Sequence, residues 1–238
     1  MEHLFFDDKE MLMSKLQDFK LCCANGEPKR LGILIHGDGG TGKTALIAAM
    51  ARLLQRNVCH CDVSKFLIEP DMIIHSFDDW YGDFFYHLSR IECFADAATS
   101  LSTSNTNPYC EALVSTDEKA RDYVRGLPKQ TGVDLRPFMR QWELCQQSKD
   151  SVVVTEVDDL SYVHPALLQP GFFDTVIHMR KASHTMLRDI IANVYDEAVK
   201  LEHIQRIPER VWAPSDVIEA SLRHANAESL IQYLETQS

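Results

Sequence analysis

The chain has 238 residues, a formal net charge of −11 and an ordinary hydrophobic content of 45%. This length suits one α/β domain with a small addition. The acidic balance, without any basic run, argues against a nucleic-acid partner, because clustered Lys and Arg bind phosphate backbones. Seven cysteines and no apolar signal or transit segment predict reduced thiols in an intracellular, cytoplasmic protein. No apolar run approaches the ~20 residues that cross a bilayer, so no membrane span is expected.

The first predicted elements are an amphipathic helix over 8–23 and a strand over 31–36. The strand segment is short, apolar and rich in β-branched residues, which is typical of a buried parallel strand. A strong helix-forming segment follows at 45–54. The chain therefore begins its core with a strand, a glycine-rich loop and a helix.

The loop between them fits the phosphate-binding pattern G-x-x-x-x-G-K-[ST] at every constrained position. Its glycines allow backbone N–H groups to turn around a polyphosphate, and the following helix contributes its dipole. The Lys43 ammonium is expected to reach the β- and γ-phosphates, and the Thr44 hydroxyl to bind Mg²⁺. The predicted nucleotide-binding residues are Gly37, Asp38, Gly39, Gly40, Thr41, Gly42, Lys43 and Thr44.

The middle of the chain has weaker patterns. We predict a second strand at 57–63, an aromatic-rich helical stretch from Pro70 to Tyr86, and a third strand at 90–96. An insertion at about 99–130 begins with a polar loop and includes a short helix at 116–124, and a helix at 135–147 follows it. Alternation within a strand sends His60 to the face opposite Cys59 and Cys61, so no metal site is expected there.

The last predicted strands are 151–155 and 173–179, and the remaining pattern is helical over 184–204, 214–224 and 226–236. We therefore expect an α/β fold in which helices flank a parallel sheet of five strands. The expected domains are an N-terminal helix at 1–27, a core at 28–180 and a small all-helical lid at 181–238.

Several segments together resemble the AAA ATPases, and among them the clade of the mitochondrial chaperone that assembles the Rieske iron–sulfur subunit. They are Pro28–Thr44, Leu54–Val58, His164–Asp174 and Ala213–Val217. The third of them is similar to the second region of homology of AAA proteins. The resemblance implies an AAA+ P-loop fold, ATP and Mg²⁺ as cofactors, a protein partner or substrate, and a homo- or hetero-oligomeric ring.

The resemblance also implies that a carboxylate pair ends the third strand, where one acid holds Mg²⁺ and the other activates water. Ala95 and Asp96 match these positions, so Asp96 is the expected catalytic and metal-binding acid. The next acid of the pattern has become Ala98, and the water-activating glutamate is missing. An alternative register uses Asp78 and Asp79.

Other family positions are altered as well. The two residues that match the arginine-finger positions are Gln169 and Phe172, and neither is cationic. The residue that matches the sensor is Asp158, which, with Glu156, is a candidate replacement for the missing base. The segment Trp80-Tyr81-Gly82 resembles an aromatic–glycine pore loop.

We therefore predict an AAA-type ATP-binding protein that couples nucleotide binding and slow hydrolysis to the remodelling of a protein partner, with Lys43 and Asp96 as its catalytic residues. The alternative is an inert pseudo-ATPase that acts as a nucleotide-bound scaffold or an inactive ring subunit. A small-molecule phosphotransferase would need lid arginines, for which Arg180, Arg188 and Arg223 are the candidates.

Overall fold

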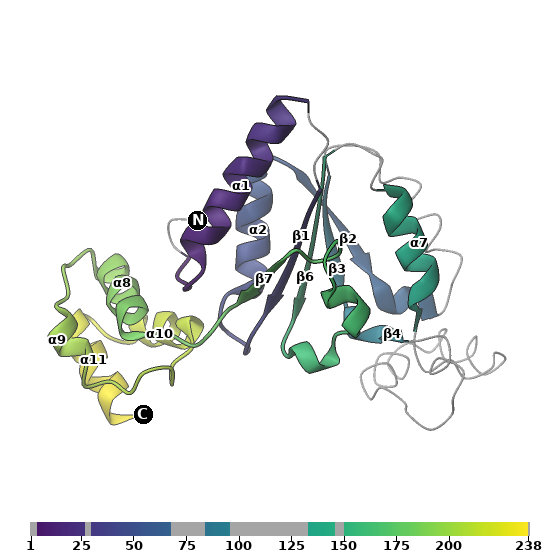
Figure 1. Cartoon of the computed structure of the whole chain (residues 1–238). Coiled ribbons are helices and arrows are strands. Elements are labelled where there is room, and N and C mark those ends of the chain that lie inside the picture. Colours follow the sequence, from purple (N-terminus) through teal and green to yellow (C-terminus); the bar gives the residue numbers. More distant parts are fainter. Residues whose placement is uncertain (1–3, 27–29, 68–83, 96–132, 146–149, 238) are drawn as a thin grey trace, which may run out of the picture. The chain divides into compact units, whose positions relative to one another are not determined.

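A computed structural model of the chain describes residues 4–26, 30–67, 84–95, 133–145 and 150–237. Five strands form the main sheet in the order β2-β3-β6-β1-β7, and helices flank it (Figure 1). The predicted α/β class with a parallel five-stranded sheet is therefore confirmed. Two compact units divide the chain, one made of 1–17, 35–54 and 177–238 and the other of 18–34 and 55–176. We call them the loop unit and the sheet unit.

The first half of the chain follows the predicted elements closely. Helix α1 spans Lys9–Ala24, strand β1 spans Arg30–His36, helix α2 spans Lys43–Leu54 and strand β2 spans Asn57–Asp62. Five consecutive residues of β1, 31–35, are buried, as expected of a strand with sheet neighbours on both sides. The predicted strand–loop–helix order around the phosphate loop is therefore correct.

The third strand is not where the sequence pattern predicts it. Strand β3 spans Phe84–Ser89 and pairs in parallel with both β2 and β6. Its first three residues, 84–86, belong to the segment for which the sequence pattern predicts a helix. The prediction is wrong there because a dense run of aromatics suits a buried helix face as well as a strand. The predicted strand 90–96 is instead the 3-10 turn Ile91–Cys93 followed by the two-residue strand β4, Phe94–Ala95.

Strand β4 belongs to a separate two-stranded sheet with β5, Val133–Asp134. The 3-10 turn Val63–Leu67 directly follows β2. The remaining predicted features of the middle segment, including the insertion at about 99–130 and the segment Trp80-Tyr81-Gly82, lie outside the described residues.

The core of the sheet unit lies between one face of the sheet and helix α7, Leu135–Cys145. Tyr86, Leu88 and Val153 are on this face, and Phe138 of α7 is completely buried against them. Strand β6, Ser151–Val157, is buried at six of its seven positions, which agrees with its place between β3 and β1. Two 3-10 turns, Leu160–Tyr162 and Pro165–Leu168, then lead to β7, Thr175–His178.

The C-terminal part of the loop unit is helical, as predicted, but it contains four helices where the pattern indicates three. The predicted helix 184–204 is divided into α8, His184–Tyr195, and α9, Leu201–Ile204, because Asp196 ends α8 in the left-handed conformation at φ 51°. Helices α10, Pro214–Ser221, and α11, Ala227–Thr236, complete this part (Figure 1). Their apolar side chains share one core, whose fully buried members include Ile191, Ile204, Val217, Leu230 and Leu234.

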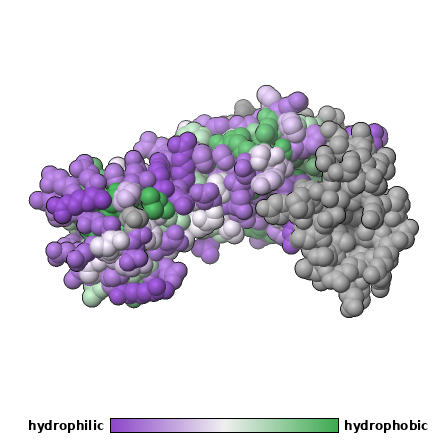
Figure 2. All heavy atoms as spheres, turned by 90° about the horizontal axis from the view of Figure 1, so that it is seen from below, coloured by the Kyte–Doolittle hydropathy of each residue, from purple (hydrophilic) through white to green (hydrophobic). Residues whose placement is uncertain are grey.

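No helix among the described residues combines the length and the apolar character needed to cross a membrane. The face in Figure 2 agrees with this finding, because hydrophilic residues dominate its described part and hydrophobic residues form only small groups.

Candidate functional site

The phosphate loop begins where β1 ends and closes where α2 begins. The Lys43 ammonium lies within the loop, where Nζ donates to the carbonyl oxygens of Gly37 at 2.6 Å and Asp38 at 3.0 Å. The Thr41 hydroxyl is buried and donates to the Asp38 carbonyl at 2.8 Å. Thr44 is exposed in the first turn of α2. The backbone of the loop therefore holds the Lys43 ammonium close to the Thr44 hydroxyl at the N-terminus of α2. The ammonium suits a polyphosphate, and the hydroxyl suits the Mg²⁺ that accompanies it.

Three of the loop glycines have backbone conformations that other residues rarely adopt. Gly37, Gly40 and Gly42 have φ values of 140°, 75° and 98°. At Gly37 the need is also steric, because a Cβ atom there would lie 1.9 Å from the carbonyl oxygen of Met179. The backbone N–H of the same residue, Met179, donates to the His36 carbonyl at 2.8 Å. The chain after β7 therefore passes so close to the start of the loop that only glycine fits.

We expect Gly37→Ala to lower the free energy of unfolding by about 3 kcal/mol, since both a forbidden φ and a backbone clash oppose the new methyl group. For a chain of this size, such a loss lowers the melting temperature by about 6–12 °C. Gly39→Ala is the matched control, because a Cβ atom at Gly39 meets no atom within 4 Å. Thermal unfolding followed by circular dichroism measures both variants. Equal melting temperatures for the two variants would contradict the described path of the loop.

The first turn of α10 contacts the phosphate loop directly. Ser215 N–H donates to the Gly40 carbonyl at 3.1 Å. A Cβ atom at Gly40 would lie 2.3 Å from Ser215 Oγ and 3.2 Å from the Ala213 methyl group. Pro214 takes the first helical position, where its missing N–H costs no intrahelical hydrogen bond. Within the loop unit, the helical part and the phosphate loop thus share a backbone hydrogen bond.

The ends of β1 and β7 bring two imidazole rings together beside the loop. His36 and His178 stack with their ring centroids 4.2 Å apart and an interplanar angle of 17°. Arg180 Nε donates to His178 Nδ1 at 3.0 Å. The other two arginines considered for a phosphotransferase pair with nearby acids: Arg188 with Asp189 in α8 at 2.6 Å, and Arg223, which follows α10, with Glu219 at 2.5 Å. This pairing counts against the phosphotransferase hypothesis.

The end of β3 carries no carboxylate. It ends at Ser89, and Arg90 follows in the left-handed conformation at φ 61°. Arg90 Nη1 lies 3.5 Å from Asp62 Oδ2 and donates to Ser64 Oγ at 3.1 Å, so its guanidinium is held at the end of β2. The predicted third strand 90–96, which was expected to end at Asp96, is not a strand of the main sheet. Asp96 itself lies outside the described residues, as do Asp78 and Asp79 of the alternative register.

The first acid after β3 is Glu92, in the turn that follows. Burial raises the pKa of its carboxyl group, and the charges of Asp158 and Asp62 raise it further, while its own backbone and Arg90 lower it. The carboxyl ends of β2, β3 and β6 thus bring together several acids and one guanidinium within the sheet unit. This group arises from tertiary structure, because its members come from segments far apart in the sequence.

The two candidate replacement bases have different surroundings. Asp158 is exposed directly after β6. Glu156 is half-buried within β6, and its Oε1 lies 3.7 Å from His87 Nε2. Strand alternation places it on the sheet face opposite the buried Val153 and Val157. Of the two, only Asp158 lies beyond the carboxyl end of a strand, which is where parallel sheets present ligand-binding groups.

The residues at the two finger positions have no cationic side chain, and one of them is part of the core. Phe172 is 4% exposed, and its ring lies 5.6 Å from Phe138 and 6.0 Å from Phe173, centroid to centroid. Gln169 is exposed at the end of the 3-10 turn Pro165–Leu168. The Phe172 side chain therefore packs within its own chain and does not face solvent.

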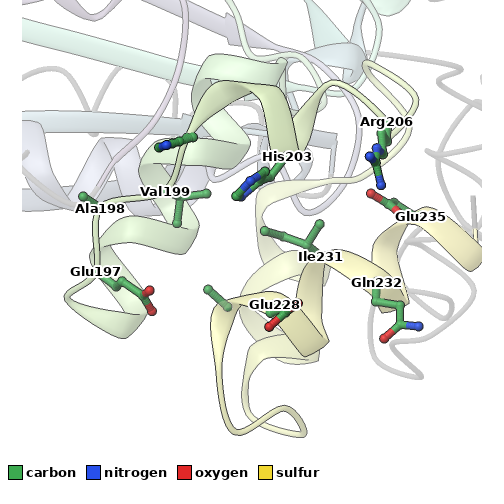
Figure 3. A pocket seen from close by; sticks show the side chains of 11 residues that line it. Glu197, Ala198, Val199, His203, Arg206, Glu228, Ile231, Gln232 and Glu235 are labelled. Carbon is green, nitrogen blue, oxygen red and sulfur yellow. The ribbon is translucent and has the colours of Figure 1, made fainter.

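A separate open cavity of about 690 Å³ lies among the C-terminal helices of the loop unit (Figure 3). Its walls come from the segment after α8, from α9 and its following turn, and from α11. In Figure 3 the side chains of Arg206 and Glu235 point toward one another across one end of it. Its lining mixes acidic and basic side chains and includes none of the phosphate-loop residues.

Sequence reasoning found the phosphate loop but missed the residues at the end of β3. A usable signal was present, because Phe84, Phe85 and Tyr86 are aromatic residues of the kind enriched in strands. The pairing of β3 with β2 and β6 shows that this segment is a strand and not a helix.

Comparison with known proteins gives distant relatives. No protein-family model matches the chain. It is similar to two proteins named AAA-ATPase from Arabidopsis thaliana, with 23% identity over 91% of this chain and 22% over 88%. It is also similar to AAA-ATPase ASD, mitochondrial, from the same plant, with 23% identity over 86%.

The matches cover 44%, 42% and 41% of these three relatives, so the chain spans less than half the length of the curated relatives it matches. Their names agree with the AAA resemblance seen in the sequence, but they do not single out the Rieske-assembly clade. The names of these relatives, the sheet order and the phosphate loop are all consistent with the resemblance to AAA ATPases.

Proposed function

We propose that this chain binds ATP with Mg²⁺ at residues 37–44. The observation that carries this proposal is the position of Lys43, whose ammonium already lies inside the loop on two backbone carbonyl oxygens. A polyphosphate offers the ammonium stronger, charged acceptors, and the glycine-rich backbone offers N–H groups in return. Thr44 supplies the hydroxyl for Mg²⁺, which keeps most of its water ligands in such sites.

We also propose that nucleotide binding is coupled to the C-terminal helices. The hydrogen bond from Ser215 N–H to the Gly40 carbonyl supports this, because Gly40 belongs to the loop that has to adapt to phosphate. Helices α8, α10 and α11 share an apolar core of their own, which allows them to move as one body when nucleotide binds. Remodelling of a protein partner, and assembly into a ring, are proposals that extend this coupling by analogy with AAA proteins.

A second candidate, the inert pseudo-ATPase, is favoured by one specific observation. The end of β3 presents Ser89 and Arg90, a hydroxyl and a guanidinium, where the resemblance calls for two carboxylates. Neither residue activates water as a general base at neutral pH, and Arg90 is already paired with Asp62. Slow hydrolysis would then depend on Asp158 or on Asp96.

Isothermal calorimetry of the full chain with ATP, ADP and GTP in magnesium buffer tests the binding proposal. We expect saturable binding of ATP with one site per chain. ATP injected without Mg²⁺ is the control, and its affinity should be lower, since the metal offsets the phosphate charge. The absence of heat with every nucleotide, from protein shown to be folded by circular dichroism, would overturn the proposal. Light scattering with and without ATP then reports whether the nucleotide also drives assembly.

A further inference from the structure

Two histidines meet across strands β2 and β3 in the sheet unit. His60 and His87 are register partners, and their Nδ1 atoms lie 3.3 Å apart. Their rings meet edge to face with centroids 4.9 Å apart. His87 is 9% exposed, whereas His60 is exposed on the outer strand of the sheet. One ring is thus fixed by burial, and the other borders solvent.

The outer nitrogen of each ring faces an oxygen atom of the same cluster. His60 Nε2 lies 3.2 Å from Ser89 Oγ. His87 Nε2 is buried, has no hydrogen-bond partner among the described residues and lies 3.7 Å from Glu156 Oε1. At 3.7 Å the carboxylate does not accept a hydrogen bond from His87, but its negative charge favours the tautomer with the proton on Nε2 and a lone pair on Nδ1. Histidine ligands of metal ions commonly have such an oxygen atom near the second ring nitrogen.

We propose that His60 and His87 form a binding site for a divalent transition-metal ion, such as Zn²⁺, that is coordinated by their Nδ1 atoms. With Zn–N bonds of about 2.0–2.1 Å and tetrahedral angles, two ligand nitrogens lie about 3.3–3.4 Å apart, which matches the observed separation. No group of three acidic, histidine or cysteine side chains in metal-binding geometry occurs among the described residues. Water therefore completes the coordination on the solvent side of His60.

The tautomer of His87 decides the hydrogen bonds of the metal-free cluster, and we take the one with its proton on the nitrogen that faces Glu156. His87 keeps its proton on Nε2, so His60 Nδ1–H donates to His87 Nδ1, and the Ser89 hydroxyl donates to His60 Nε2. On metal binding, the His60 proton moves to Nε2 and the Ser89 hydroxyl becomes the acceptor. Burial, the largest cause, lowers the pKa of His87, while the charge of Glu156 raises it.

The neighbouring thiols do not belong to this site. Cys59 and Cys61 flank His60 in β2, and alternation directs their side chains to the other face of the sheet. Burial, with smaller contributions from neighbouring acidic groups, raises the pKa of Cys61 to about 12.

The test is a titration of the full chain with Zn²⁺ in competition with a chromogenic zinc indicator, without nucleotide and with a thiol-free reductant. His60→Ala should weaken Zn²⁺ binding at least tenfold. Glu156→Gln, which removes the negative charge next to His87 Nε2, should weaken it about tenfold.

His203→Ala removes an exposed histidine of α9 and is the matched control, with the Zn²⁺ affinity unchanged. The double change Cys59→Ser and Cys61→Ser should also leave the affinity unchanged.

A wild-type measurement keeps the proposal testable even if the variants fold poorly. Zn²⁺ should shift the imidazole ¹⁵N resonances of His60 and His87 together. The proposal is overturned if these resonances stay unchanged at saturating Zn²⁺, if His60→Ala binds as tightly as the wild type, or if the double cysteine variant loses the binding. None of these outcomes depends on ATP, so the nucleotide proposal is tested separately.

Discussion

Lys43→Ala is expected to abolish the thermal stabilisation that ATP gives to the protein. A ligand present at 100 times its dissociation constant stabilises the folded state by about 2.7 kcal/mol. For a chain of this size that energy raises the melting temperature by about 5–11 °C. The variant should lose this shift, because the Lys43 ammonium is the one charged group that the described loop encloses with its own carbonyl oxygens. Differential scanning fluorimetry with and without Mg-ATP measures it.

The matched control is Lys65→Ala, which removes an exposed lysine from the 3-10 turn Val63–Leu67. It should keep the full ATP-dependent shift. Without nucleotide, both variants should melt close to the wild type, since neither lysine is in the apolar core. A variant lacking Lys43 that is still stabilised by ATP to the wild-type extent would mean that nucleotide binds elsewhere or through other groups.

The second large effect is expected from restoring acids at the end of β3. We expect the double change Ser89→Asp and Arg90→Glu to raise Mg-ATP hydrolysis about 100-fold or more, since a positioned general base contributes about 10²–10⁴ in rate. The reason is positional. In the resembling family the carboxylate pair ends the third strand, and in this chain that strand is β3, which ends at Ser89. Phosphate release in a coupled enzymatic assay measures the rate.

Two controls make this result specific. Ala95→Glu, which sequence reasoning alone would choose, should have no effect, because Ala95 ends β4 in the separate two-stranded sheet. Adding Lys43→Ala to the double variant should remove the gained activity. If Ala95→Glu raises the rate and the change at 89 and 90 does not, the assignment of β3 as the acid-bearing strand is wrong. Arg90→Glu also places a new acid near Asp62, so the stability of the variant needs to be checked by thermal unfolding.

These two experiments separate the candidate functions. Loss of ATP stabilisation on changing Lys43, with negligible hydrolysis by the wild type, would describe a nucleotide-bound scaffold. Hydrolysis by the wild type that depends on Lys43 would describe a slow ATPase and would direct attention to Asp158, which is exposed after β6. Because the Phe172 side chain packs in the core, it is not available at this finger position to a neighbouring subunit.

The sequence by itself determined the elements whose signals are local. The phosphate loop, β1, α2 and β6 could be predicted because glycine spacing, β-branched runs and helix-forming runs are properties of a few consecutive residues. The parallel five-stranded sheet followed from the order of these segments, and the structure agrees with it.

Only the tertiary structure decided which residues end the third strand. Phe84–Ser89 is a strand because it has neighbours on both sides in β2 and β6, whereas its run of aromatics suits a strand or a buried helix face and does not decide between them. The same pairing places Ser89 and Arg90 where acids were expected and brings His60 against His87. A strand's side-chain period can be read along the chain, but its neighbours are set by contacts between segments distant in sequence.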